Sequence, residues 1–157
     1  MHVKKRPALY KRQKVLVALL NAFGGKLPNV DMQKYLFLFT KTCEQEPSYE
    51  FVPYRFGCFS FQSYADRRKL IEFGVLANSD GWNLIDKGEP MPTDLVQKAA
   101  LFSDKYATLK GDNLVRRVYR DFPYYAVRSE IADRLMSSEE LASIKDALPT
   151  ENEPAFF

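Results

Sequence analysis

The sequence has little of the chemistry on which most enzymes and secreted proteins depend. It contains one histidine, His2, and two cysteines, Cys43 and Cys58. A single histidine near the start of the chain leaves a Ser-His-Asp or Cys-His arrangement without a credible general base. The cysteine spacing fits no zinc or redox motif, and two thiols are too few for a secreted disulfide scaffold. We therefore expect a reduced, cytoplasmic protein that has no catalytic centre, metal site or cofactor.

Long apolar runs and signal-peptide features are also missing. No stretch reaches the ~18 apolar residues that a membrane-spanning helix needs. The basic start of the chain is followed by an apolar run that contains Asn21 and lacks a small-residue cleavage pattern. We expect neither membrane insertion nor export.

What the chain has is aromatic and aliphatic bulk. It has 157 residues, of which 46% are hydrophobic, including 12 Phe and 9 Tyr. This length and composition are typical of one ordinary globular domain that buries its own core.

Charge is distributed unevenly along the chain. The formal net charge is only +3. Seven basic residues precede the first acid, Asp31, whereas from Ser137 onward Lys145 is the one base among several acids. The seven basic residues are Lys4, Lys5, Arg6, Lys11, Arg12, Lys14 and Lys26. We expect one positive and one negative end.

Apolar periodicity predicts three helices in the first half of the chain. The expected ranges are 8–23, 32–42 and 61–73, with Asp31 and Ser60 as N-caps of the second and third. Leu36, Phe37 and Phe39 are expected core residues of the second helix. Glycines after the first and third ranges suit helix ends.

Short strands are predicted around these helices. Residues 75–77 and 82–86 are separated by a polar turn ending in Gly81 and read as a β-hairpin. Residues 49–56 are aromatic but contain Pro53, which predicts an edge strand or an extended loop. Three helices followed by a two-stranded hairpin is the order of a winged helix-turn-helix.

The last third of the chain is predicted to be helical, over 94–109, 113–122, 129–136 and 138–148. The expected fold class is therefore mainly α with a small β-hairpin (α+β), a winged helix with a helical C-terminal extension. The predicted organisation is a winged-helix domain over 1–90 and a helical extension over 91–150 that packs or dimerises. Residues 151–157, which end in two phenylalanines, are either a tail or the start of a missing domain.

Two short motifs lie between residues 31 and 60. The first contains Gln33, Lys34, Leu36 and Phe37, and the second Tyr54, Phe56, Gly57, Phe59 and Ser60. Together they resemble bacterial winged-helix domains related to the Panacea antitoxin domain. In that family a helix opening with Leu-Gln-Lys-Leu-Leu-Phe leads to a Tyr-x-Tyr-Gly-Pro-Tyr-Ser turn and a further helix. Cys58 stands where proline is common in that turn.

The resemblance extends to a later segment and carries functional implications. Residues 119–135 resemble the linker of a family in which the winged helix precedes a domain of unknown function. The resemblance implies a regulator that binds DNA, or an antitoxin-like adaptor that binds a protein, and assigns no reaction. It also allows a targeting domain of a larger enzyme.

The third predicted helix is the candidate recognition element. Its residues 61, 64 and 65 are expected to face the core and Asp66 to face solvent. The candidate contacts to double-stranded DNA are polar or basic, and an ordinary solvated or protein-binding face has the same composition. They are Gln62, Ser63, Arg67 and Lys69 of this helix, with Lys4, Lys5, Arg6, Lys11 and Arg12 near the chain start.

We expect structural rather than functional roles for the remaining candidate groups. The alternating aromatics between Tyr49 and Phe61 could stack on single-stranded bases, but we expect them to form a buried face. Cys58 is expected to be an inert, partly buried thiol. Asp66 with Glu72, and Asp121 with Glu130, are expected to be separate surface carboxylates rather than acid pairs. We predict a winged-helix regulator that binds DNA and can form a homodimer. The alternative is an adaptor that binds another protein.

Overall fold

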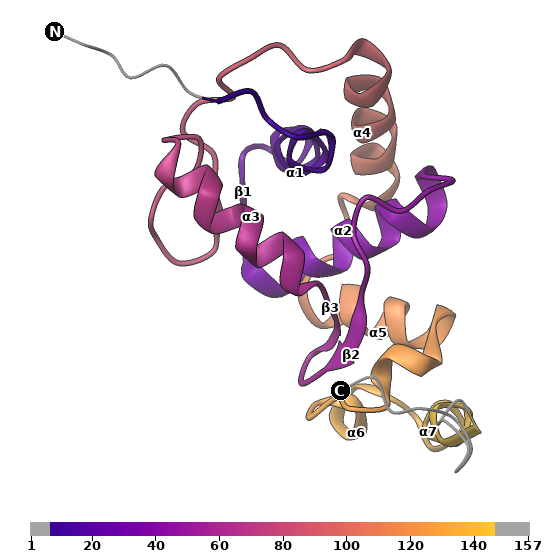
Figure 1. The fold of residues 1–157 in the computed structure, drawn as a ribbon. Helices are drawn as coiled ribbons and strands as arrows, with labels where there is room; N and C mark the ends of the chain where they lie inside the picture. The colour runs from indigo at the N-terminus through magenta and orange to yellow at the C-terminus, as the bar shows by residue number, and fades with distance from the viewer. Residues whose placement is uncertain (1–6, 147–157) are drawn as a thin grey trace, which may run out of the picture.

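The structure is a computed structural model that describes residues 7–146, and within them the chain is mainly helical with small antiparallel β-pairings (Figure 1). This confirms the predicted fold class of a mainly α protein with a small hairpin. The elements in chain order are α1 (Lys11–Ala22), β1 (Lys26–Leu27), α2 (Asn29–Cys43), β2 (Val52–Tyr54), β3 (Gly57–Phe59), α3 (Phe61–Glu72), β4 (Trp82–Asn83), α4 (Thr93–Tyr106), α5 (Gly111–Asp121), the 3-10 helix η1 (Pro123–Ala126), α6 (Ala132–Leu135) and α7 (Ser138–Asp146).

Helix α2 runs through the middle of the molecule. Its residues from 31 to 40 are all buried, because helices pack on more than one of its sides. Figure 1 shows α1, α3 and α4 toward one side of α2, and α5 to α7 toward the other. An apolar helix that is buried all round is typical of a core element. The predicted core residues Leu36, Phe37 and Phe39 are confirmed.

One hydrophobic core continues across the predicted domain boundary at residue 90. Phe102 of α4 contacts Phe23 and Tyr35 through edge-on rings, with centroids 6.1 and 6.4 Å apart. Leu114 and Tyr119 of α5 belong to the same buried cluster as the side chains of α1 and α2. The division into 1–90 and 91–150 stays a prediction, and residues 147–157 lie outside the described residues.

The predicted hairpin of residues 75–77 and 82–86 is present. Leu76 and Leu84 form an antiparallel bridge, and the Ala77 N–H donates to the Asn83 carbonyl at 2.9 Å. Strand β4 then pairs with β1, with Leu27 opposite Trp82. This pairing joins the chain before α2 to the chain after α3.

A second hairpin was only half predicted. Residues 49–56 were expected as an edge strand or loop, and β2 lies within them. Its partner β3 is formed by the glycine and aromatic residues that follow, with Pro53 opposite Cys58. Proline has no N–H, so it is tolerated where a strand has one neighbour.

Helix α3 begins where the sequence predicted. The Ser60 side chain accepts a hydrogen bond from the Ser63 N–H at 3.1 Å, which is an N-cap. The predicted helix over 129–136 is wrong in its first half. A 3-10 turn, η1, begins at Pro123, and only α6 is α-helical between residues 129 and 136.

Among residues 7–146, no helix combines the length and the apolar character needed to cross a membrane.

Candidate binding surface

Ser63, a predicted DNA contact, lies inside the protein. Its hydroxyl accepts a hydrogen bond from the Gln33 amide at 2.8 Å and donates to the Ser60 carbonyl at 2.8 Å. The side chain is fully buried between α3 and α2. The prediction is wrong for this residue, because its place one turn after the N-cap turns it toward α2 rather than toward solvent.

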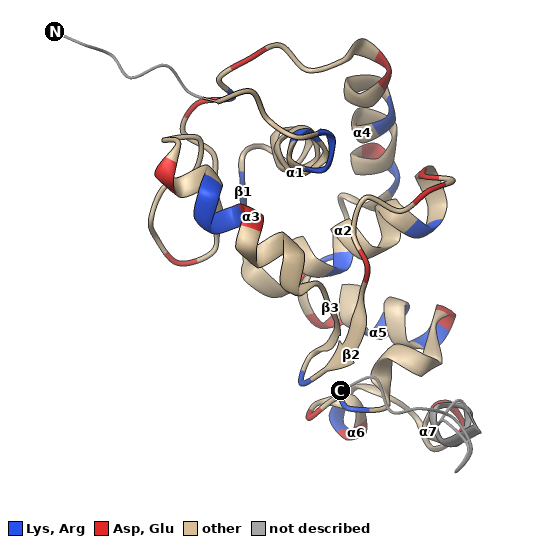
Figure 2. Ribbon diagram, in the orientation of Figure 1, with Lys and Arg blue, Asp and Glu red and all other residues tan. Residues whose placement is uncertain are grey.

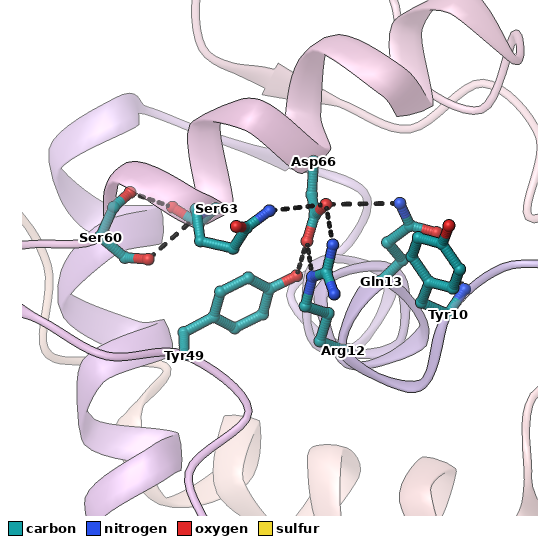
Figure 3. Close-up of polar contacts among 8 residues, drawn as sticks. Tyr10, Arg12, Gln13, Tyr49, Ser60, Ser63 and Asp66 are labelled. Carbon is teal, nitrogen blue, oxygen red and sulfur yellow. Dashed lines mark hydrogen bonds and ion pairs between the residues drawn. The ribbon is translucent and has the colours of Figure 1, made fainter.

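Asp66 was expected to face solvent and instead is the centre of a buried network between α1 and α3 (Figure 3). The Arg12 guanidinium bonds it from α1, and the Tyr49 hydroxyl donates to it at 2.8 Å from the loop before β2. Amides of Gln13 and Gln62 also donate to the carboxylate, at 3.4 and 3.2 Å. Two predicted DNA contacts, Arg12 and Gln62, therefore point toward an internal acid.

The pKa of Asp66 follows from this network. Burial raises the pKa of the carboxyl, but hydrogen bonds from Arg12, Tyr49 and Gln13 outweigh it and hold the pKa below its ordinary value of 3.8. The carboxylate is therefore charged and matched by the Arg12 guanidinium. Asp66 and Glu72 form no acid pair, as expected, since Glu72 pairs with Lys69; the expectation that both carboxylates lie at the surface is wrong for Asp66.

Arg67 binds the loop that precedes β4. Its Nη2 donates to the carbonyl oxygens of Ser79 and Gly81, at 2.8 Å each. Gly81 has a φ of +77°, and a Cβ there would lie 2.9 Å from the Leu27 carbonyl oxygen. The predicted DNA contact thus holds the tip of the hairpin against α3 and β1.

The other predicted contacts are dispersed. Lys69 is exposed and pairs with Glu72 at 3.4 Å. Lys11 lines a pocket of about 740 Å³ whose rim carries both lysines and carboxylates. Lys4, Lys5 and Arg6 lie outside the described residues.

The exposed face of α3 and the hairpin tip is not strongly positive. Arg68 and Lys69 are exposed on α3, but Glu72 follows them and Asp80 lies at the tip. Figure 2 shows the basic segment of α3 next to acidic ones. A phosphate-binding surface would need a larger excess of cations.

Exposed rings lie along the β2–β3 hairpin and at the start of α3. Phe61 is 61% exposed, Phe56 46% and Tyr54 40%. Phe59 and Tyr64 lie beside them, stacked with ring centroids 4.9 Å apart, and Phe59 also contacts Phe61 at 4.8 Å. These five residues are called the aromatic patch below. The prediction that these aromatics are core is wrong for Tyr54, Phe56 and Phe61.

A pocket of about 450 Å³ adjoins the aromatic patch. It lies between the start of α2 and the β2–β3 hairpin, and its lining includes Lys34, Cys58 and Tyr64. Lys34 and Cys58 are buried, and the Lys34 Nζ donates to the Cys58 carbonyl at 3.1 Å. Burial raises the pKa of the Cys58 thiol to about 11, which fits the inert thiol expected from the sequence.

Across residues 7–146, no group of three or more His, Cys, Asp or Glu could hold a metal ion. Asp121 pairs with Arg117 and Glu130 with Arg55, so these carboxylates belong to separate surface ion pairs. Comparison with protein-family models, curated proteins and solved structures found no match. The resemblance to Panacea-related domains therefore stays a prediction.

Proposed function

We propose that this protein is a non-catalytic protein-binding module and that the aromatic patch is its docking surface. The observation that carries the proposal is the exposure of Tyr54 and Phe61, whose ring centroids lie 5.7 Å apart, together with exposed Phe56 at the turn of the same hairpin. Contiguous exposed apolar area of this kind is typical of interaction sites, and aromatic rings are enriched in protein interfaces. The unpaired thiols support a cytoplasmic location.

The polar residues around the patch support protein binding over DNA binding. Ser63 is buried, Arg67 binds the hairpin tip and Arg12 binds Asp66, so these three predicted DNA contacts have partners inside the chain. The exposed cations of α3, Arg68 and Lys69, lie near the acidic Glu72, whereas the start of α3 exposes aromatic carbon. An adaptor of this kind is also what the resemblance to antitoxin domains implies.

The test is capture of a partner with variants of the patch. Phe56→Ser and Phe61→Ser are expected to abolish capture of a polypeptide that the wild-type chain binds, since they remove exposed carbon without opening the core. Leu101→Ser is the control, because Leu101 is 71% exposed on α4 outside the patch. Capture that survives both phenylalanine substitutions, or that Leu101→Ser reduces equally, contradicts the proposal. Sedimentation of the purified chain tells a second copy from a different protein.

DNA binding is the second candidate function, and the order of elements favours it. The order of a helix, a strand, two more helices and a hairpin whose second strand pairs with β1 resembles that of a winged helix. The β2–β3 hairpin, which lies between the second and third of these helices, is an addition to that order. Arg68 and Lys69 are exposed on α3. A shift assay with duplex DNA at several salt concentrations tests it, with Arg68→Ala and Lys69→Ala against Lys105→Ala on α4. Binding that weakens with salt and with the α3 substitutions alone supports DNA binding.

A further inference from the structure

The charged residues that line the pocket beside the aromatic patch are all basic. Its wall is mainly carbon, from Val30 of α2 and the rings of Tyr54, Phe56, Phe59 and Tyr64. Lys34 and Arg55 also line it, whereas no aspartate or glutamate does. At about 450 Å³ it falls within the size range of small-ligand sites, which combine apolar walls with a few polar groups.

Lys34 is the unusual group in this pocket. Its side chain is 2% exposed, which is rare for a lysine. An ammonium has three N–H donors, and among residues 7–146 the hydrogen bond to the Cys58 carbonyl uses one of them. Burial lowers the pKa of Lys34, so the fold is stabilised less by this side chain than by an apolar one of the same size. Stability alone does not explain a lysine at this position.

Two other polar residues of the lining, Gln33 and Arg55, are already bonded or lie at its rim. The Gln33 carbonyl oxygen accepts from the Ser60 N–H at 2.9 Å, and its amide donates to Ser63. Arg55 is exposed at the hairpin turn, 3.7 Å from Glu130. Asp31 lies near enough to favour the Lys34 ammonium but is absent from the lining and accepts from the Gly111 N–H. Lys34 is thus the deep polar group with donors left for a ligand.

We propose that this pocket binds a carboxylate carried on an aromatic or apolar group, with Lys34 bonding the carboxylate and the ring walls covering the carbon. A buried ammonium gains a charge-assisted hydrogen bond and a counter-ion when the acid binds. Arg55 at the rim steers the anion toward the opening. The carboxylate can belong to a small acid or to the end of a polypeptide, so the site does not depend on the proposed protein-binding function.

The experiment titrates the wild-type chain with phenylacetate and with phenylacetamide, its neutral analogue, and follows the amide resonances of residues 57–59. Saturable shifts are expected with phenylacetate, with affinity about 10- to 100-fold above that for phenylacetamide, the worth of one charged hydrogen bond. Lys34→Met should remove this preference, and Lys26→Met, at an exposed lysine of β1, should keep it. Circular dichroism checks that both variants are folded.

The source of the acid is resolved in a second arm with a short peptide ending in Phe, as the free carboxylate and as the amide. Preference for the free peptide over phenylacetate assigns the site to a polypeptide terminus, and the reverse assigns it to a small acid. Equal affinity for phenylacetate and phenylacetamide overturns the proposal in the wild-type chain itself, even if Lys34→Met fails to fold. Absence of binding of every acid up to about 10 mM also overturns it. Neither result affects the patch variants that test protein binding.

Discussion

The Arg12 guanidinium of α1 donates two hydrogen bonds to the Asp66 carboxylate of α3, from Nε to Oδ2 at 2.7 Å and from Nη2 to Oδ1 at 3.1 Å. The pair joins helices that are far apart in the chain, and Tyr49 ties the loop before β2 to the same carboxylate. Asp66 is 2% exposed whereas the Arg12 side chain is 36% exposed, so water reaches the pair from the Arg12 side. This geometry fixes α3 relative to α1 and so places the aromatic patch at its start.

Replacement of Asp66 with alanine should lower the free energy of unfolding by about 1–3 kcal/mol. The loss leaves the buried Tyr49 hydroxyl without its acceptor, whereas the Arg12 side chain is 36% exposed and can turn to water. Urea denaturation measures it. Glu72→Ala, which breaks a surface pair on the same helix, should cost less than about 1 kcal/mol. Equal costs for the two variants would show that the network contributes no more than a surface ion pair.

The same carboxylate should make stability depend on acid. Its pKa is lower in the folded chain than the ordinary 3.8, so its contribution is present above 3.8 and is lost as the pH falls through the folded value. The difference in unfolding free energy between wild type and Asp66→Asn should therefore shrink as the pH drops below about 3.8. A difference that stays constant down to strongly acidic pH would contradict the assigned cause.

Gly57 at the β2–β3 turn should tolerate no side chain. Its φ is +96°, and a Cβ would lie 2.5 Å from Cε1 of Tyr119 in α5. Gly24 is a matched control, with a φ of +93° and no atom within 4 Å of the added carbon. Gly24→Ala should cost about 1–2 kcal/mol from the backbone alone. Gly57→Ala should cost about 1–3 kcal/mol more from the collision, measured by thermal or urea unfolding.

The approximate positions of α1, α2 and α3 were predictable from local sequence, although α2 begins at Asn29, before the expected cap Asp31. Ser60 is an N-cap by residue type, and the structure starts α3 directly after it. The leucines and phenylalanines of α2 predicted a buried helix, and they are buried. Residues 75–77 and 82–86 carried their own turn, so their pairing was also predictable.

Hydrophobicity alone does not predict which face of α3 is buried, so the expected buried and exposed faces were partly wrong. Ser63, Asp66 and Leu70 recur at helical spacing and form the buried face, although two of them are polar. Because this face is buried, Phe61 lies on the exposed side of the helix. The partner of Asp66 lies in another helix, and no pattern within α3 reveals it. The three-residue spacing of the N-cap Ser60 and Ser63 was the one local feature that indicated a buried position for Ser63.

Arg67 should stabilise the hairpin tip locally rather than the whole fold. Arg67→Ala removes the hydrogen bonds to the Ser79 and Gly81 carbonyls. The Ala77 amide, which pairs with Asn83 in this hairpin, should exchange with solvent faster by about 5- to 10-fold, as expected for the loss of about 1 kcal/mol of local stability. Amide exchange by NMR measures this, with exposed Arg68→Ala as the control. Unchanged exchange at Ala77 would mean that β1–β4 pairing alone holds the tip.

Lys34 should make the unfolding free energy depend on pH above neutral, and Lys34→Met should lack this dependence. Burial lowers the pKa of Lys34 from the ordinary 10.5, so the unfolded chain binds this proton more tightly than the folded one. The resulting cost to folding is fully present below the folded pKa and disappears as the pH rises toward 10.5. The unfolding free energy of Lys34→Met relative to wild type should therefore fall as the pH is raised from neutral, in urea melts at matched ionic strength. Lys26→Met is the control at an exposed lysine and should show no such trend. Parallel curves for wild type and Lys34→Met would mean that the buried amine bears no such penalty.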